Sequence, residues 1–499
     1  MQYNCPVHES WNIVHIGSLL PESHAIYVCG DNCLRGVVMT AAEMGLTSRF
    51  SAVMPTEAEI RDGRLEEVTI RGTADLIRKL PYRPRAVLLF LVCMHHMVGA
   101  DENYIFRTLE REFPDICFLR CWMDPAMQKL GPSPDMKLRR EMLSPLKAGK
   151  LPKASEGAAH ENFVALVSDN LPLPEDSTLA QLLRALGIPF RQPQDCSSFS
   201  EYQFLGRAAL FLTRSPAACF GLRKFTAEEK KEGMYLPVKL GYGDIREILG
   251  QLLEKLLRCG LLSQQTKAPA EAVTEEQTEF TSAAKVGFTE DVQAWLVDFC
   301  RREEDACEAA FAALPDFLYR TEISLDGVGL LQPLSAARLL LEHGLPVKRI
   351  YLDAVLSEEK RDLEWLKEHA PEVEILSVSD IRAFNRARSA ATKQEHGNAA
   401  DGAETAFAEE NIRLALGPVA AFYEDTAYFV NQIENRGAWG YQAIRQLLRD
   451  MTEACTEEKS AEELVQRKGW GLPSLVEPLP GGSHGFAERS ALIGTSRKG

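Results

Sequence analysis

Apolar runs that alternate with helical segments constrain the fold of this 499-residue chain more than any other feature. The runs 25–28 (AIYV), 86–92 (AVLLFLV) and 163–168 (FVALVS) have the length and composition of buried strands. A helical pattern over 34–45 follows the first run, and Gly45 is expected to end it. Because parallel strands need a crossover of about this length, the alternation predicts βαβ units.

The same alternation continues along the chain. Further strands are expected at 116–121, 208–213, 321–326, 348–353, 373–378 and 412–417, and further helices at 101–113, 177–187, 334–344 and 362–370. We therefore predict an α/β fold of three doubly wound parallel-sheet (Rossmann-like) domains. The expected divisions are an N-terminal α/β domain (1–150), a middle α/β domain (158–265), a polar linker (266–285), a C-terminal α/β domain (286–455) and a partly disordered tail (456–499).

The composition of the chain limits the kinds of partner that it can bind. Hydrophobic residues make up 45% of the chain, enough for several cores, and the net charge is −15. That charge argues against nucleic acid as a partner, because binding phosphates requires a basic face. No run of about 18 apolar residues exists, and the N-terminus lacks the pattern of a signal peptide. We expect a cytoplasmic protein without a membrane partner.

Three N-terminal cysteines form the candidate site. Cys33 lies in GDNCLRG, a turn that leads into a helix, and Cys93 directly follows an apolar run. Both positions belong to the carboxyl ends of strands, where open α/β sheets bind ligands. With Cys5 they make three thiolates, one fewer than a closed tetrahedral site needs, so a partner subunit or an open position would complete the site. Cys29 is an alternative to Cys33, and three unrelated core cysteines are the simplest alternative of all.

Other candidate residues have more ordinary explanations. His95 and His96 follow Cys93, and satisfied loop histidines are favoured over a proton donor or ligand. Asp101 opens a helix, which N-capping explains. Cys219 follows a strand at some distance and is a weak candidate ligand. The chain has no CxxC, GxGxxG, GxxxxGK[ST] or GxSxG motif, so it carries no recognisable zinc ribbon, nucleotide loop or serine elbow.

The ordered set of segments resembles the nitrogenase component 1 family, which comprises the α and β subunits of the nitrogenase molybdenum–iron protein and their relatives. The resemblance rests on NCP at Cys5, GDNCLRG at Cys33 and AVLLFLVCMHHMVGADE at Cys93, with family-like spacings of 28 and 60 positions. The resemblance extends towards the C-terminus through two further segments, QPLSAARLLLEHG with KRIYLD and FVNQIENRGAWGYQAI. It covers residues 1–455 and implies three domains around a central cleft.

The resemblance also implies a function. Cys5, Cys33 and Cys93 would ligate an iron–sulfur cluster, 4Fe–4S or larger, shared between the subunits of a homodimer or of a heterodimer with a paralogous subunit. An ATP-dependent iron protein would be the reductase. The chain would then be an oxidoreductase component that passes electrons to an unknown substrate or cofactor. The alternative is a non-catalytic scaffold for metallocofactor assembly.

Two departures from the family pattern bear on the chemistry. Trp439 stands where the family has the histidine that binds the molybdenum–iron cofactor, and Cys219 lies several positions after the strand end that carries the cofactor cysteine. An indole offers an N–H donor and no lone pair for a metal. The resemblance is therefore to a nitrogenase-like protein, and we do not expect a true nitrogenase.

Overall fold

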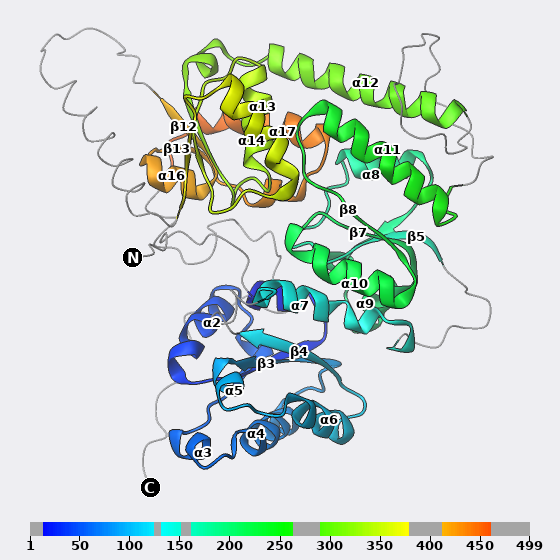
Figure 1. Ribbon diagram of the computed structural model, residues 1–499, viewed down its shortest axis with the longest axis vertical. Helices are drawn as coiled ribbons and strands as arrows, with labels where there is room; N and C mark the ends of the chain where they lie inside the picture. The colour runs from blue at the N-terminus through cyan, green and yellow to red at the C-terminus, as the bar shows by residue number, and fades with distance from the viewer. Residues whose placement is uncertain (1–12, 124–130, 151–160, 263–289, 379–411, 461–499) are drawn as a thin grey trace, which may run out of the picture.

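The computed structural model describes residues 13–123, 131–150, 161–262, 290–378 and 412–460. The described strands form three sheets, and every strand pair in them is parallel. In Figure 1 the N-terminal sheet lies at the bottom, and the other two lie above it. The predicted α/β fold with parallel sheets is confirmed. None of the described helices is long and apolar enough to span a membrane.

Sheet A belongs to the N-terminal part of the chain and has the strand order β2-β1-β3-β4. Its strands are β1 (Ser23–Val28), β2 (Phe50–Val53), β3 (Ala86–Val92) and β4 (Cys117–Met123). The helices around it are α1 (Ile13–Ser18), α2 (Asp31–Glu43), α3 (Glu57–Arg61), α4 (Leu65–Lys79), α5 (Cys93–Met97), α6 (Glu102–Glu112) and α7 (Pro134–Met142).

Sheet B belongs to the middle of the chain and has the order β6-β5-β7-β8. Its strands are β5 (Glu161–Leu166), β6 (Phe190–Arg191), β7 (Ala208–Thr213) and β8 (Glu232–Tyr235). The longer helices of this part are α8 (Thr178–Ala185), α9 (Phe199–Phe204), α10 (Cys219–Glu229) and α11 (Tyr242–Arg258).

Sheet C follows with the order β11-β10-β9-β12-β13. Its strands are β9 (Glu322–Asp326), β10 (Val347–Tyr351), β11 (Glu374–Leu376), β12 (Arg413–Leu416) and β13 (Tyr428–Val430). The helices are α12 (Glu290–Ala312), α13 (Pro333–Glu342), α14 (Lys360–His369), α16 (Pro418–Glu424) and α17 (Tyr441–Ala454).

The central strands of sheet B are buried on both faces, and residues of β5 alternate between two cores. On β5, Val164 and Leu166 belong to the core that reaches the C-terminal part of the chain, whereas Phe163 and Ala165 belong to the core that includes sheet A. Such alternation follows from the two-residue period of a strand. The middle sheet therefore joins the N-terminal and C-terminal parts through opposite faces.

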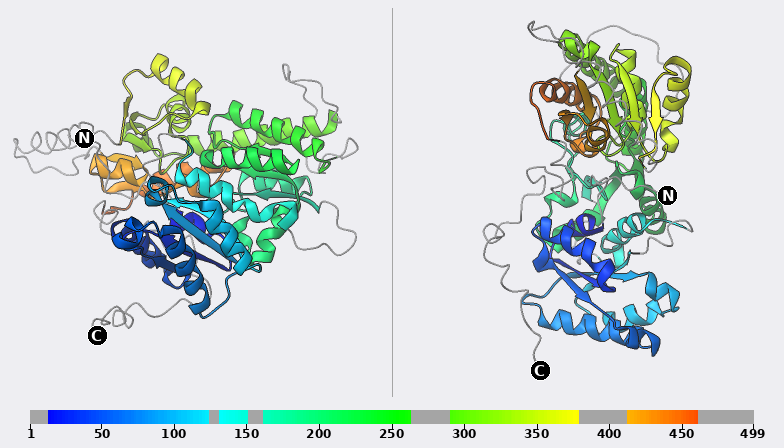
Figure 2. Two further views of the ribbon diagram at one scale, coloured as in Figure 1. Left: turned by 60° about the horizontal axis from the view of Figure 1, so that its bottom comes forward. Right: turned by 90° about the vertical axis from the view of Figure 1, so that its left-hand side faces the viewer.

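The middle and C-terminal parts share one continuous core. Helix α12, at the top of Figure 1, contributes Cys307 and Phe311 to this core, and it is also tied to α11 by an ion pair between Arg246 and Glu304 (2.6 Å). Figure 2 shows the same two parts side by side, with sheet A set below them. The predicted linker 266–285 lies outside the described residues, as do residues 461–499 of the predicted tail, and the domain boundaries stay a prediction.

The predicted strands and the predicted helix end at Gly45 are confirmed. All nine apolar runs named above contain a strand. Gly45 has φ +67°, and Leu46 N–H donates to Ala41 O (2.7 Å), a bond that satisfies a terminal carbonyl of α2. The strands that sequence analysis missed are β2, β6, β8 and β13. Each has at most four residues, too few for a periodicity to stand out.

Two glycines allow the loops after β9 and β12 of sheet C to approach each other closely. A Cβ atom on Gly329, after β9, would lie 2.7 Å from Gly417 Cα and 3.0 Å from Leu416 O. Gly417 itself has φ +130° and would place a Cβ against the carboxylate of Asp326. Because the atoms opposite Gly329 belong to the backbone, they cannot move aside as a flexible side chain could.

We expect Gly329→Ala to destabilise the protein by about 1–3 kcal/mol, because the added methyl group overpacks a backbone contact. Gly250→Ala is the matched control. Gly250 lies inside α11, and a Cβ added there would meet nothing within 4 Å, so alanine should raise stability by about 0.5–1 kcal/mol. Urea unfolding of both variants measures the difference, and equal stabilities would contradict the predicted contact.

Candidate metal centre

The candidate cysteines lie at the point where the strand order of sheet A reverses. From β1 the chain moves outward to β2, then returns to place β3 on the other side of β1. The loops that follow β1 and β3 therefore diverge at the carboxyl edge, the place where open α/β sheets bind ligands. Cys29 and Cys33 follow β1, and Cys93 follows β3. Because Val28 pairs with Leu91, the two strands end at the same level of the sheet.

Local structure sets the direction of each segment. Gly30 is the N-cap of α2 and offers no side chain to the first amides of the helix, and Cys33 lies in the first turn. The N–H groups of Cys33 and Leu34 both point back to Gly30 O, at 3.1 and 3.2 Å. On the neighbouring strand, Cys93 is the first residue of the short helix α5. Both candidate thiols thus belong to the first turn of a helix that starts at the carboxyl edge of the sheet.

The three described cysteines differ in exposure. Cys33 is exposed, Cys93 is half-buried, and Cys29 is fully buried. Burial, with smaller contributions from Cys33 and Asp31, raises the pKa of Cys29 to about 12. A protonated, buried thiol is a poor nucleophile and a poor metal ligand.

The described residues do not by themselves complete a metal site. Cys5 lies outside the described residues, so its position relative to Cys33 and Cys93 is not assigned. No group of three His, Cys, Asp or Glu side chains within the described ranges is arranged to hold a metal ion. The described residues therefore place two thiols of the predicted set, the exposed Cys33 and the half-buried Cys93, at one sheet edge, without a third described ligand.

His95 is a satisfied structural histidine, as predicted, although α5 replaces the expected loop. Its Nδ1 accepts the N–H of Val92 (3.3 Å), and its Nε2 is 3.2 Å from Thr69 Oγ1. Burial lowers the pKa of His95 to about 4, and a hydrogen bond that a protonated Nδ1 would donate to Val92 O, 3.3 Å away, only partly offsets this. Asp101 likewise has the predicted capping role, because its Oδ1 accepts the N–H of Tyr104 (2.9 Å) at the start of α6.

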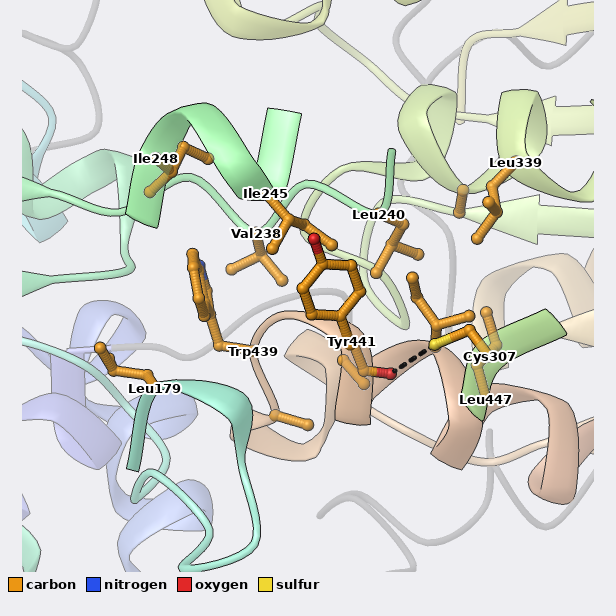
Figure 3. Packing of buried hydrophobic residues seen from close by; sticks show 14 of the residues in the cluster. Leu179, Val238, Leu240, Ile245, Ile248, Cys307, Leu339, Trp439, Tyr441 and Leu447 are labelled. Carbon is orange, nitrogen blue, oxygen red and sulfur yellow. Dashed lines mark hydrogen bonds between the residues drawn. The ribbon is translucent and has the colours of Figure 1, made fainter. Parts of the chain in front are cut away.

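Trp439 and Cys219 are both packed into the protein. Trp439 is fully buried, and its Nε1–H donates to Pro237 O (2.9 Å). In Figure 3 the indole stands among Leu179, Val238 and Ile248. Cys219 is the first residue of α10, 9% exposed, and its thiol is 3.7 Å from Ser215 O. Burial raises the pKa of Cys219 to about 11, so this thiol stays protonated.

Sequence analysis missed a second polar cluster at the junction of the three parts of the chain. It contains Arg139 on α7, Asp169 and Asn170 after β5, Arg214 after β7 and Glu434 after β13. Asp169, Asn170 and Arg214 follow predicted apolar strand runs, the same signal that located the cysteines. Glu434 follows β13, which sequence analysis missed. Their residue types suggested no motif, because the partners lie far apart in sequence.

Comparison with known proteins identifies the fold. No family model and no curated protein matches the chain. A solved structure described as "Nitrogenase Cp1 at pH 6.5" is similar, with a TM-score of 0.59 and 10% identity, over 91% of this chain and 93% of that one. A second, "Nitrogenase Cp1 at pH 5", has a TM-score of 0.47 and 8% identity over 96% and 92% of the chains. The first likeness shows that this chain shares a nitrogenase-like fold.

We expect Cys33 in metal-free protein to react with iodoacetamide more than about a hundredfold faster than Cys29, because Cys29 is buried and holds its proton. Mass spectrometry of the peptide that contains both residues would locate the label. In urea-unfolded protein the two rates should converge. Comparable rates in the folded protein would contradict the described burial of Cys29.

Proposed function

We propose that this chain is a nitrogenase-like iron–sulfur oxidoreductase component whose cluster is held by Cys5, Cys33 and Cys93. The observation that carries the proposal is the presentation of two thiols, Cys33 and Cys93, at the topological switch point of sheet A. The shared fold with a nitrogenase component supports it. Thiolates are the ligands that iron–sulfur clusters require.

Exposure favours Cys33 over Cys29 as the ligand. A cluster bound between subunits must be reached from the surface, and Cys33 is exposed whereas Cys29 is fully buried. Cys33 also lies in the first turn of α2, where the positive end of the helix dipole stabilises a thiolate. Cys29 would have to lose a proton in an apolar environment to become a ligand.

Apolar side chains near the cysteines favour a partner at this edge. Met54 follows the end of β2 and is 54% exposed, while Met97 and Val98, just after Cys93, are 84% and 50% exposed. Exposed apolar residues grouped at one edge are typical of protein interfaces. A second subunit that covers them would bring its own cysteines to the cluster and remove it from water. We propose a dimer, of two identical chains or of this chain with a paralogous subunit.

The chemistry follows from the ligands. An iron–sulfur cluster supplies one-electron transfer when it is bound. Cys33 and Cys93 would fix its position, the amides at the start of α2 would favour the negative charge of the ligated thiolates, and the interface would set its exposure to water. We propose an ATP-dependent iron protein as the electron donor, by the family resemblance. The substrate or cofactor that accepts the electrons is left open.

The molybdenum–iron cofactor of true nitrogenase does not fit the described residues. The Trp439 indole is enclosed by aliphatic side chains, and its single N–H is used by Pro237 O. The Cys219 thiol is protonated and directed to Ser215 O in the first turn of α10. The indole offers no lone pair to a metal, and the Cys219 thiol would have to lose its proton and its hydrogen bond, so we propose that this chain does not reduce dinitrogen.

A scaffold for metallocofactor assembly is the second candidate. The filled space between the middle and C-terminal parts favours it, because the cavity lined by Asp169, Arg214 and Glu434 measures only about 10 Å³. Such a volume is about enough for one water molecule. Turnover with a matched iron protein and ATP separates the two candidates: sustained electron transfer to an acceptor supports the oxidoreductase, and transfer of an intact cluster to another protein supports the scaffold.

We expect anaerobic reconstitution with iron and sulfide to give brown protein with similar amounts of iron and acid-labile sulfide. Cys33→Ala and Cys93→Ala should each lose most of the iron, because alanine cannot replace a thiolate ligand. Cys259→Ala is the matched control, since Cys259 follows α11 and bonds to Lys255 O (2.9 Å). A Cys33→Ala variant with full iron, together with an iron-free Cys29→Ala variant, would transfer the ligand role to Cys29.

We expect Met97→Glu to weaken dimer formation and cluster retention together, because the carboxylate would be buried in the proposed interface. Anaerobic sedimentation velocity gives the oligomeric state. Ile375→Glu, on β11 at the far edge of sheet C, replaces a residue that is 36% exposed and should leave both properties unchanged. A wild-type monomer that carries its full cluster would rule out the shared site.

A further inference from the structure

A chain of hydrogen bonds joins the three parts of the protein at one point. Arg139 on α7 donates from Nη2 to Asn170 Oδ1 (2.8 Å), and Asn170 Nδ2 donates to Glu434 Oε1 (2.6 Å). These residues come from the N-terminal, middle and C-terminal parts in that order. We call this cluster, with Asp169 and Arg214, the three-part junction.

A buried ion pair anchors the junction. Arg214 Nε donates to Asp169 Oδ2 (2.9 Å), and both side chains are less than 10% exposed. Asp169 Oδ1 also accepts the N–H groups of Arg214 (2.7 Å) and Ser215 (3.1 Å). Arg214 Nη1 donates across to Gly437 O of the C-terminal part. Both oxygens of Asp169 and most donors of Arg214 thus already have hydrogen-bond partners. Arg214 therefore neutralises mainly Asp169 and not Glu434.

Glu434 is carried by a turn of unfavourable backbone conformation. Glu434, Asn435 and Arg436 have φ angles of 47°, 55° and 52°, and Gly437 follows at 75°. Three successive non-glycine residues in the left-handed region are rare, and such strain persists only where the surroundings enforce it. Two bonds to the loop after β9 do so here: Glu434 N–H to Val328 O and Asn435 N–H to Gly329 O, both 2.9 Å. The turn would relax if these contacts opened.

Charged side chains from several elements surround Glu434. Burial raises the pKa of Glu434 to about 7, and the nearby Asp169 adds to this, while Arg139, Asn170 and Arg214 lower it. Arg139 is committed to Asp135 (2.8 Å) as well as to Asn170. On the outer side, Arg436 of the same turn lies 3.5 Å from Asp450 on α17. The described cations near Glu434, which are Arg139, Arg214 and Arg436, therefore each pair with another carboxylate.

We propose that Glu434 is a proton-controlled latch that closes the three-part junction. Protonated Glu434 fits the closed junction, because a neutral carboxyl group needs neither a counter-ion nor hydration. Ionised Glu434 is placed close to the Asp169 carboxylate in a space with room for about one water molecule, and it gains hydration when the turn opens. Proton loss therefore favours release of the strained turn and access to the junction.

The direction and the size of the expected pH dependence follow from the linkage between proton binding and opening. A carboxyl group whose pKa is raised in the closed form binds its proton more tightly there than in the open form. The stability of the closed form is then greatest at low pH and falls as pH rises through the folded pKa of about 7. If the open form has an ordinary carboxyl pKa, the opening constant should be about tenfold larger at pH 8 than at pH 6.

Amide hydrogen exchange of the full-length protein tests the latch. The turn carries four hydrogen-bonded amides, at 434, 435, 436 and 438, and their exchange, divided by the intrinsic rate at each pH, reports the opening constant. We expect about a tenfold rise from pH 6 to pH 8 in the wild type, and a flat profile in Glu434→Gln. Strand 86–92 of sheet A serves as the internal reference and should show no such change.

Glu359→Gln is the matched control. Burial also raises the pKa of Glu359 to about 7, but this residue accepts the N–H of Leu334 at the start of α13, outside the junction. The variant should keep the wild-type profile of the turn. Asn170→Asp adds a second carboxylate beside Glu434 and should move the midpoint to higher pH. A flat wild-type profile, or an unchanged pH dependence in Glu434→Gln, would overturn the proposal.

Discussion

The buried pair of Asp169 and Arg214 holds together loops from two parts of the protein. Its carboxylate fixes the backbone after β7, and its guanidinium fixes Leu171 O after β5 and Gly437 O in the C-terminal turn. Removing one charge of such a pair leaves the other buried without compensation, at a cost of about 3–5 kcal/mol. The positions of Asn170 and Glu434, and with them the closure of the junction, depend on this pair.

The carboxyl edges of the three sheets satisfy their polar groups in different ways. In sheet C the buried Asp326 accepts the N–H groups of Val328, Gly329 and Ala420, at 2.9, 2.7 and 2.7 Å. In sheet B, Asp169 has the equivalent role. In sheet A no side chain caps the start of α2 after Gly30. Within the described residues, this edge has no buried carboxylate equivalent to Asp326 or Asp169, and it is the edge that carries the exposed Cys33, the ligand that we propose.

Local sequence was sufficient for much of the fold and for the position of the cysteines. Long apolar strands such as β3 and helix ends such as Gly45 depend on neighbours in the chain, so periodicity and turn chemistry predict them. The same local signal placed Cys93 at a strand end. It could not decide between Cys29 and Cys33, because their difference in burial arises from packing against sheet A.

The three-part junction was beyond sequence reasoning for a physical reason. Arg139, Asn170 and Glu434 meet only when the three parts have docked, and no residue spacing encodes that contact. The middle and C-terminal parts also share one continuous packed interior, and no local sequence pattern predicts such a shared core.

The buried position of Trp439 has a consequence for biosynthesis. Its indole packs against Leu179 of α8 and Ile248 of α11, and Gly440 lies so close to Thr178 that a Cβ would be 2.7 Å from that side chain. The middle part cannot complete its interior until this C-terminal segment has left the ribosome. Contacts between such distant segments make folding slow and leave apolar surface exposed meanwhile. A nascent chain of this protein would therefore be prone to aggregate until Trp439 has left the ribosome.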